Sequence, residues 1–136
     1  MKYLILLLFL SGCSELPPQL NDNPYQQRAI ELVAQYNSKH GTSVPVPPVR
    51  ISDISNLDEG EAYCPIHASG CWLTINESFD NQRHGIGYAM SNSLPHEVAH
   101  HICVYLKKCP PGNYHGPEWQ EIAVELGLHD DFFISH

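Results

Sequence analysis

The stretch His96-Glu97-Val98-Ala99-His100 carries the chemistry around which the rest of this sequence is arranged. On a helix, residues four apart are separated by one turn and about 40°, so His96 and His100 point from one face toward a common point. Two neutral imidazoles at this spacing can bind Zn²⁺, and Glu97 is placed to take a proton from a metal-bound water. The segment therefore predicts a metal-binding helix.

A third zinc ligand has to come from outside this helix, because a catalytic zinc normally takes three protein ligands and keeps a fourth position for water. The metzincin pattern would require Gly at position 103 and His at position 106, whereas the chain has Cys103 and Leu106. We favour His115, because the loop over residues 108–113 can fold it back over the metal. A glutamate from the following helix is the alternative, through Glu118, Glu121 or Glu125.

Other residues near the motif are assigned different roles. The His101 side chain points about 100° around the helix from that of His100, so it is predicted to pack or to face solvent rather than to bind metal. Tyr88, Tyr105 and Tyr114 are candidate donors to a developing oxyanion, and the sequence does not choose among them. Trp119 recurs with the apolar residues of the last helix and is predicted to belong to the core.

Apolar periodicity and capping residues predict an α+β domain around the motif. An N-terminal helix over 24–40 should stop at Gly41, and three short strands should form an antiparallel sheet over 49–51, 61–66 and 71–76. The polar segment 80–87 is expected to be a loop. The metal-binding helix should begin at a cap on Asn92 or Ser93 and run through Leu106, and a last helix should start at Pro117 and end at Gly127.

The N-terminus has the pattern of an export signal. Lys2 precedes the apolar run 3–10, which is too short to span a bilayer, and Leu10-Ser11-Gly12-Cys13 follows. This tetrapeptide resembles the lipobox of bacterial lipoproteins, which implies a signal over 1–12, a lipid on Cys13 and a tether through residue 24. An ordinary signal peptide with an incidental cysteine is the alternative reading.

Four cysteines remain in the mature chain, an even number in a compartment where disulfides persist. We favour the pair Cys64–Cys71, which closes a turn containing Pro and Gly, and the pair Cys103–Cys109, which ties a helix end to the next loop. The second pair requires the helix to end near Lys107 or Lys108. A four-thiolate zinc site is disfavoured, because neither pair has the spacing of two to four residues typical of such sites.

The charge balance argues against nucleic-acid partners. The 136 residues carry a formal net charge of −8, and loss of the first 12 leaves six Lys and Arg against 15 Asp and Glu, a charge of −9. Binding to nucleic acid depends mainly on Lys and Arg, so DNA and RNA are unlikely partners for this acidic chain. With 43% apolar residues, the chain can build one small core.

The segment His115-Gly116-Pro117-Glu118-Trp119 adds a second motif downstream of the first. With both motifs, the chain resembles the SprT-like metallopeptidases, in which an H-E-x-x-H helix is followed by a His-Gly-x-x-aromatic segment that opens the next helix. The resemblance covers roughly residues 25–128 and is specific over 96–127. It implies a minimal zincin-like fold in which His96, His100 and His115 bind Zn²⁺ and Glu97 is the general base. A C-terminal zinc ribbon and a basic DNA-binding extension are missing from the pattern.

These inferences combine into one expected function. Residues 25–136 should form a zinc metalloendopeptidase that hydrolyses proteins or peptides at the cell envelope. A lipid anchor would hold it to the membrane on the extracytoplasmic side, which is the periplasmic face of the outer membrane in a Gram-negative cell. The alternative is a non-catalytic zinc-binding envelope lipoprotein with a structural or partner-binding role.

Overall fold

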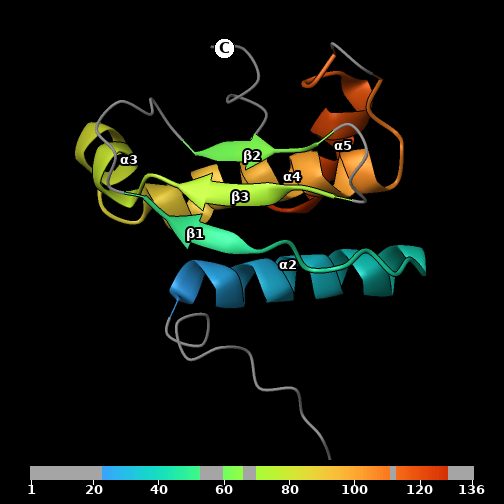
Figure 1. Ribbon diagram of the computed structural model, residues 1–136, viewed down its shortest axis with the longest axis horizontal. Helices are drawn as coiled ribbons and strands as arrows, with labels where there is room; N and C mark the ends of the chain where they lie inside the picture. The colour runs from blue at the N-terminus through green and yellow to red at the C-terminus, as the bar shows by residue number, and fades with distance from the viewer. Residues whose placement is uncertain (1–22, 53–59, 66–69, 111–112, 129–136) are drawn as a thin grey trace, which may run out of the picture.

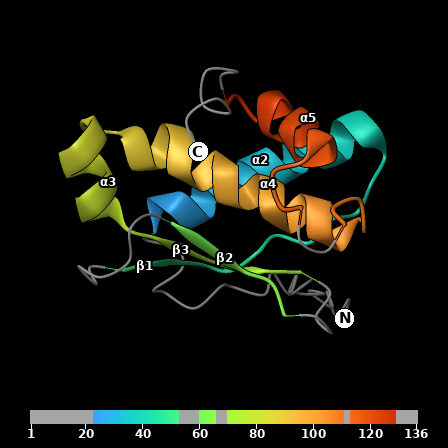
Figure 2. The same cartoon turned by 90° about the horizontal axis from the view of Figure 1, so that it is seen from above.

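The computed structural model describes residues 23–52, 60–65, 70–110 and 113–128. Helices cover one face of a small sheet, so the chain forms two layers and the predicted α+β class is confirmed (Figures 1 and 2). The predicted signal, Cys13 and the tether up to residue 22 lie outside the described residues. Among the described helices, none combines the length and the apolar character needed to cross a membrane.

Helix α2, Pro24–His40, forms where the sequence predicts it. The Asn23 side chain accepts hydrogen bonds from the first backbone N–H groups, and Gly41 ends the helix with a φ of 62°, which glycine adopts without strain. Asn23 also donates from Nδ2 to the carbonyl oxygen of Val49 at 3.0 Å. The start of α2 is therefore fixed against the first strand.

The sheet contains strands β1 (Val49–Ile51), β2 (Glu61–Tyr63) and β3 (Trp72–Ile75), in the order β1-β3-β2. Strand β2 is antiparallel to β3, but β1 is parallel to it, so the prediction of an all-antiparallel sheet is wrong. The physical reason is that β3 lies between the other two strands. β1 therefore forms no hairpin with β2, which is the short connection that would have made the two consecutive strands antiparallel.

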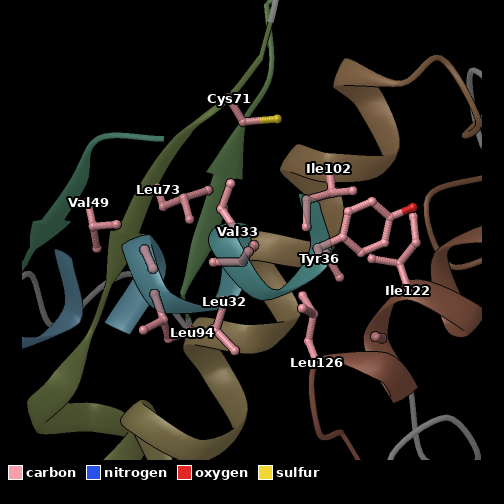
Figure 3. Close-up of a cluster of buried hydrophobic side chains, with 14 of the residues drawn as sticks. Leu32, Val33, Tyr36, Val49, Cys71, Leu73, Leu94, Ile102, Ile122 and Leu126 are labelled. Atoms are coloured by element: carbon pink, nitrogen blue, oxygen red, sulfur yellow. The ribbon is translucent and has the colours of Figure 1, made fainter. Parts of the chain in front are cut away.

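The core lies between the sheet and the helices and joins all of these elements. Figure 3 shows Leu73 of β3 beside Val33 of α2, with Ile102 and Ile122 contributed by α4 (Leu94–Tyr105) and α5 (Pro117–Glu125). Each of these four side chains is buried. Because α4 packs against α2, α5 and the sheet, the helix that carries the metal motif is the central one of the fold.

The segment expected to be a loop over 80–87 contains most of a helix, α3 (Glu77–His84). The side chain of Asn76 caps it by accepting from the N–H of Phe79, and two acidic residues in the first turn favour it electrostatically. A surface helix this polar lacks apolar periodicity, which is why the sequence pattern did not reveal it. Within α3 the buried side chain is that of Asp80, which accepts a hydrogen bond from Ser93 Oγ at 2.5 Å.

Helix α4, which carries His96 and His100, also starts differently from the prediction. A five-residue π-helix, η1 (Ala89–Ser93), runs directly into α4, and Ser93 has helical angles and caps nothing. The predicted cap at Asn92 or Ser93 is therefore wrong. Pro95 has no N–H, and its ring would collide with a carbonyl one α-turn earlier, so a wider turn just before it fits its chemistry.

Both favoured disulfides are present in the structure. Cys64 pairs with Cys71 at a Cα–Cα distance of 4.1 Å, and Cys103 pairs with Cys109 at 5.3 Å. Helix α4 ends at Tyr105, which frees the chain to turn back toward Cys103 as the second pair requires. With all four thiols in disulfides, the four-thiolate zinc site is excluded.

His101 is a packing residue, as predicted, and it ties α4 to the sheet. It is 2% exposed, its Nδ1 accepts from the N–H of Cys71 at 2.9 Å, and its Nε2 lies 2.7 Å from the carbonyl oxygen of Pro45. Burial lowers the pKa of His101 although the bond to Pro45 opposes this effect. The neutral ring, protonated on Nε2, therefore satisfies two backbone groups.

Gly70 is the position at which this arrangement is most sensitive. A Cβ on Gly70 would lie 2.6 Å from Cε1 of His101, and its φ is +152°. His101 is held by two hydrogen bonds and has no room to yield. We expect Gly70→Ala to lower the free energy of unfolding by about 1–3 kcal/mol, measured by urea denaturation. The control is Gly85→Ala, because Gly85 has a φ of +106° but open space around it. Equal losses for the two variants would contradict the proposed clash.

The raised pKa of Tyr25 predicts that the protein loses stability at alkaline pH. Burial, reinforced by the neighbouring carboxylate of Glu77, raises the pKa of Tyr25 from 10.0 to about 12. The unfolded chain therefore releases this proton first, so the contribution of Tyr25 is complete below pH 10 and is lost as the pH rises to about 12. Urea midpoints across this range should fall more steeply for the wild type than for Tyr25→Phe. Parallel curves would contradict the assignment.

Candidate metal centre

Three imidazoles from two parts of the chain converge at one point. His96 and His100 lie one turn apart on α4, and His115 comes from the segment just before α5. Their Nε2 atoms form a nearly equilateral triangle, with separations of 3.2 Å for His96–His100, 3.1 Å for His100–His115 and 3.2 Å for His96–His115. Among the described residues, this is the group whose side chains are arranged to hold a metal ion.

The glutamates considered as alternatives to His115 lie elsewhere. Glu118, Glu121 and Glu125 line a separate cavity together with Tyr36 and His40 of α2. Glu125 is engaged there, because it lies 2.7 Å from Nε2 of His40 and 3.3 Å from Nζ of Lys39. Partial burial raises the pKa of Glu125, but these hydrogen bonds outweigh that effect and lower it. The structure thus groups His115, and none of the glutamates, with the two motif histidines.

The triangle fits a tetrahedral zinc ion. Zn–N bonds of about 2.0–2.1 Å in tetrahedral geometry place two ligand nitrogens about 3.3–3.4 Å apart. The observed separations of 3.1 and 3.2 Å approach that spacing. Burial, followed by the two neighbouring imidazoles, lowers the pKa of His100 to about 3, so the ring is neutral, which is the form that binds metal.

Trp119 holds the three rings in place. Its ring centroid lies 4.7 Å from that of His96, 5.1 Å from His100 and 4.6 Å from His115. The side chain is 1% exposed, so its predicted place in the core is confirmed, but its contact with every imidazole is a role that the apolar pattern did not reveal. The signal in the sequence is its position four residues after His115, in the first turn of α5.

Glu97 lies in the same cleft as the triad. It is 6% exposed, and the cleft has a volume of about 370 Å³. A Cβ on Gly60 would come within 3.3 Å of Cγ of Glu97 and 3.1 Å of the Thr74 carbonyl oxygen. Glycine at position 60 therefore allows the β2 side of the cleft to approach the Glu97 carboxylate closely.

The wall opposite α4 is strand β2. The cleft is lined by the following residues: Gly60, Glu61, Ala62, Cys64, His96, Glu97, His100, Val104, Tyr114 and His115. In the described sheet β2 is an edge strand that pairs only with β3, so the backbone groups of its other edge are unpaired within the sheet. The cleft thus runs between α4 and the edge of β2 that pairs with no other strand of the described sheet.

Of the three tyrosines considered as oxyanion donors, the structure brings one into the cleft. Tyr114 lines it and is 59% exposed. Tyr88 stacks on His84 instead, and the Tyr105 ring lies 6.3 Å from that of His101. Tyr114 is the candidate that the geometry retains.

Three converging imidazoles, with a carboxylate lining the same cleft of a small α+β domain, form a donor set suited to a single metal ion. The model of the SprT-like family matches residues 29–134, and the chain belongs to this family. No curated protein and no solved structure matches the chain significantly. The resemblance seen in the two sequence motifs is therefore confirmed by the family match.

Proposed function

We propose that this protein is a zinc-dependent metallopeptidase in which His96, His100 and His115 bind the metal and Glu97 is the general base. The observation that carries the proposal is the near-equilateral triangle of Nε2 atoms in one cleft with the Glu97 carboxylate. Membership of the SprT-like family supports it. When bound, zinc supplies a Lewis acid that polarises a carbonyl group and lowers the pKa of water.

Each residue of the cleft has a defined task in this proposal. Glu97 takes the proton from the attacking water and passes it to the leaving amine. Tyr114, at the rim of the cleft, donates a hydrogen bond from its hydroxyl group to the developing oxyanion. Trp119 keeps the three imidazoles oriented, so little rotational freedom is lost when the metal binds.

The edge of β2 that is unpaired in the described sheet supports a peptide as the substrate. An extended peptide can add to a free strand edge through main-chain hydrogen bonds, which provide affinity without regard to sequence. A peptide bound beside residues 61–63 would run along the cleft, with its main chain beside the three imidazoles and Glu97. This arrangement suits hydrolysis within a chain.

The test of the proposed function is cleavage of a peptide library, followed by mass spectrometry, with zinc removed by a chelator and then restored. We expect cleavage with one zinc per chain, loss on chelation and recovery on addition of zinc. One bound zinc without cleavage of any peptide would favour the alternative, a non-catalytic zinc-binding module. X-ray absorption distinguishes the two further, because a structural site is closed by a fourth protein ligand.

We also propose that the domain acts at the cell envelope, anchored through a lipid on Cys13. The lipobox-like sequence supports this address, and two disulfides are typical of an oxidising compartment. Fractionation of cells should recover the full chain with the membranes, and Cys13→Ser should release it. Recovery of the wild-type chain in the cytosol would refute the address while leaving the proposed chemistry untouched.

A further inference from the structure

The described helices lie on one face of the sheet (Figure 2). Trp72 points to the opposite face, because the next residue of β3, Leu73, is buried against the helices and successive side chains of a strand alternate. Tyr63 of β2 and Trp72 of β3 are 56% and 57% exposed, and they are cross-strand partners whose ring centroids lie 6.0 Å apart. Such a pair removes much apolar surface from water only when something packs on it. Neither residue has a role in the chemistry proposed above.

Tyr63 belongs to β2, the strand whose residues Glu61 and Ala62 line the cleft. Successive side chains of a strand point to opposite faces of the sheet, so Glu61 and Tyr63 share the outer face while Ala62 points to the other. A strand added beside β2 would place one side chain next to Glu61 and another, two residues away, next to Tyr63. This relation holds whether the added strand runs parallel or antiparallel to β2.

The charged residues beside the unpaired edge of β2 are acidic. Glu61 is exposed and has no ion pair within the described residues. Glu61 and Glu97 are the charged residues among those that line the described cleft, and no Lys or Arg is among them. A cationic side chain beside Glu61 would therefore meet no competing cation in the cleft.

We propose that Glu61 and Tyr63 determine substrate specificity, selecting an extended peptide that has Lys or Arg two residues from an aromatic or large aliphatic side chain. This inference rests on the proposed pairing of the substrate with β2. The apolar side chain of the peptide packs on Tyr63, whose ring lies beside that of Trp72 on the neighbouring strand. The Lys or Arg of the peptide lies beside Glu61. Cross-strand pairs of these kinds each favour binding by about 2- to 5-fold.

The test measures binding as well as cleavage. Fluorescence anisotropy gives the Kd of labelled peptides for the full-length Glu97→Gln chain, loaded with zinc so that nothing is hydrolysed. The peptide set carries Phe and Lys two residues apart, the same residues three apart, and versions with Ser for Phe or Glu for Lys. The first peptide should bind most tightly, because a spacing of three places the two side chains on opposite faces.

Variants assign the preference to individual residues. Added to this background, Glu61→Lys should reverse the preference from Lys to Glu, and Tyr63→Ser should remove the preference for Phe and leave that for Lys. Ile86→Ser is the control, since Ile86 is fully exposed and does not line the cleft. Cleavage profiles of the same variants with Glu97 intact should show the same changes.

Two outcomes would overturn the inference: peptides that bind without discrimination, or preferences that Glu61→Lys and Tyr63→Ser leave unchanged. If the wild type cleaves peptides while these preferences are absent, the proposed function stands and the specificity assignment fails. Selective binding without cleavage by the wild type would support the specificity assignment and refute the peptidase.

Discussion

The Glu97→Gln protein, loaded with zinc, is expected to retain the metal and to lose peptide hydrolysis by a factor of about 10²–10⁴. Glutamine has nearly the size and shape of glutamate, so it keeps the contact with the β2 side of the cleft, where Gly60 approaches Cγ of residue 97. Its amide cannot accept a proton from water at neutral pH. The metal should stay, because the three Nε2 atoms that could hold it belong to histidines. Zinc content and cleavage rate, measured on the same sample, check this result.

The control for this variant is Glu118→Gln, which makes the same change of charge on α5 at a residue outside the cleft that contains the three imidazoles. It should retain both zinc and activity. Hydrolysis at the wild-type rate by zinc-loaded Glu97→Gln would reject Glu97 as the general base. Loss of zinc from that variant would instead mean that Glu97 takes part in binding the metal.

The His115→Ala variant is expected to fail at the earlier step, metal binding. Removing one of three ligands should weaken zinc affinity by more than the roughly 10- to 100-fold cost of losing an outer-shell partner. His96 and His100 stay on one helix and can still form a weak site, so some zinc should bind at high concentration. Competition with a chromophoric chelator measures the change in Kd.

His84→Ala provides the matched control, because His84 is an exposed histidine that stacks on Tyr88 outside the cleft. Its zinc affinity should equal that of the wild type. Full zinc affinity in His115→Ala would transfer the third ligand to one of the glutamates of α5, which would then have to leave the separate cavity that they line.

Much of the fold can be predicted from local sequence signals, such as helix caps and closely spaced cysteines. Helix α2 lies between a capping Asn23 and a left-handed Gly41, and both residues act through their immediate neighbours. The two disulfides join cysteines that are seven and six positions apart, so their pairing depends on short stretches of chain. Signals of this kind require no knowledge of distant contacts.

The features that sequence reasoning missed depend on distant contacts or on competition between neighbours. The parallel pairing of β1 depends on β3, rather than the next strand along the chain, lying beside it, and no local pattern of β1 displays that choice of neighbour. Ser93 resembles a helix cap, but its hydroxyl donates to the buried Asp80 and the backbone continues as a helix. In that case a tertiary hydrogen bond replaced the local one.

The candidate site could be predicted better than the sheet could. The spacing of His96 and His100 fixes their common face, and the short loop over 108–113 lets His115 fold back toward them. The sequence pattern does not predict which residues form the wall of the cleft opposite α4. Gly60 and the edge of β2 reach the cleft through strand pairing far from the motif, and Trp119 meets the imidazoles only after α5 has docked on α4.

Titration of the metal-free chain with zinc, while the rate of peptide cleavage is recorded, tests the central claim most directly. We predict that the rate rises in proportion to added zinc and reaches a plateau at one equivalent. The Glu97→Gln chain should bind the same equivalent and show at least about 100-fold less cleavage. A wild-type chain that is as active without zinc as with it, or that binds one zinc and cleaves no peptide, would contradict the account.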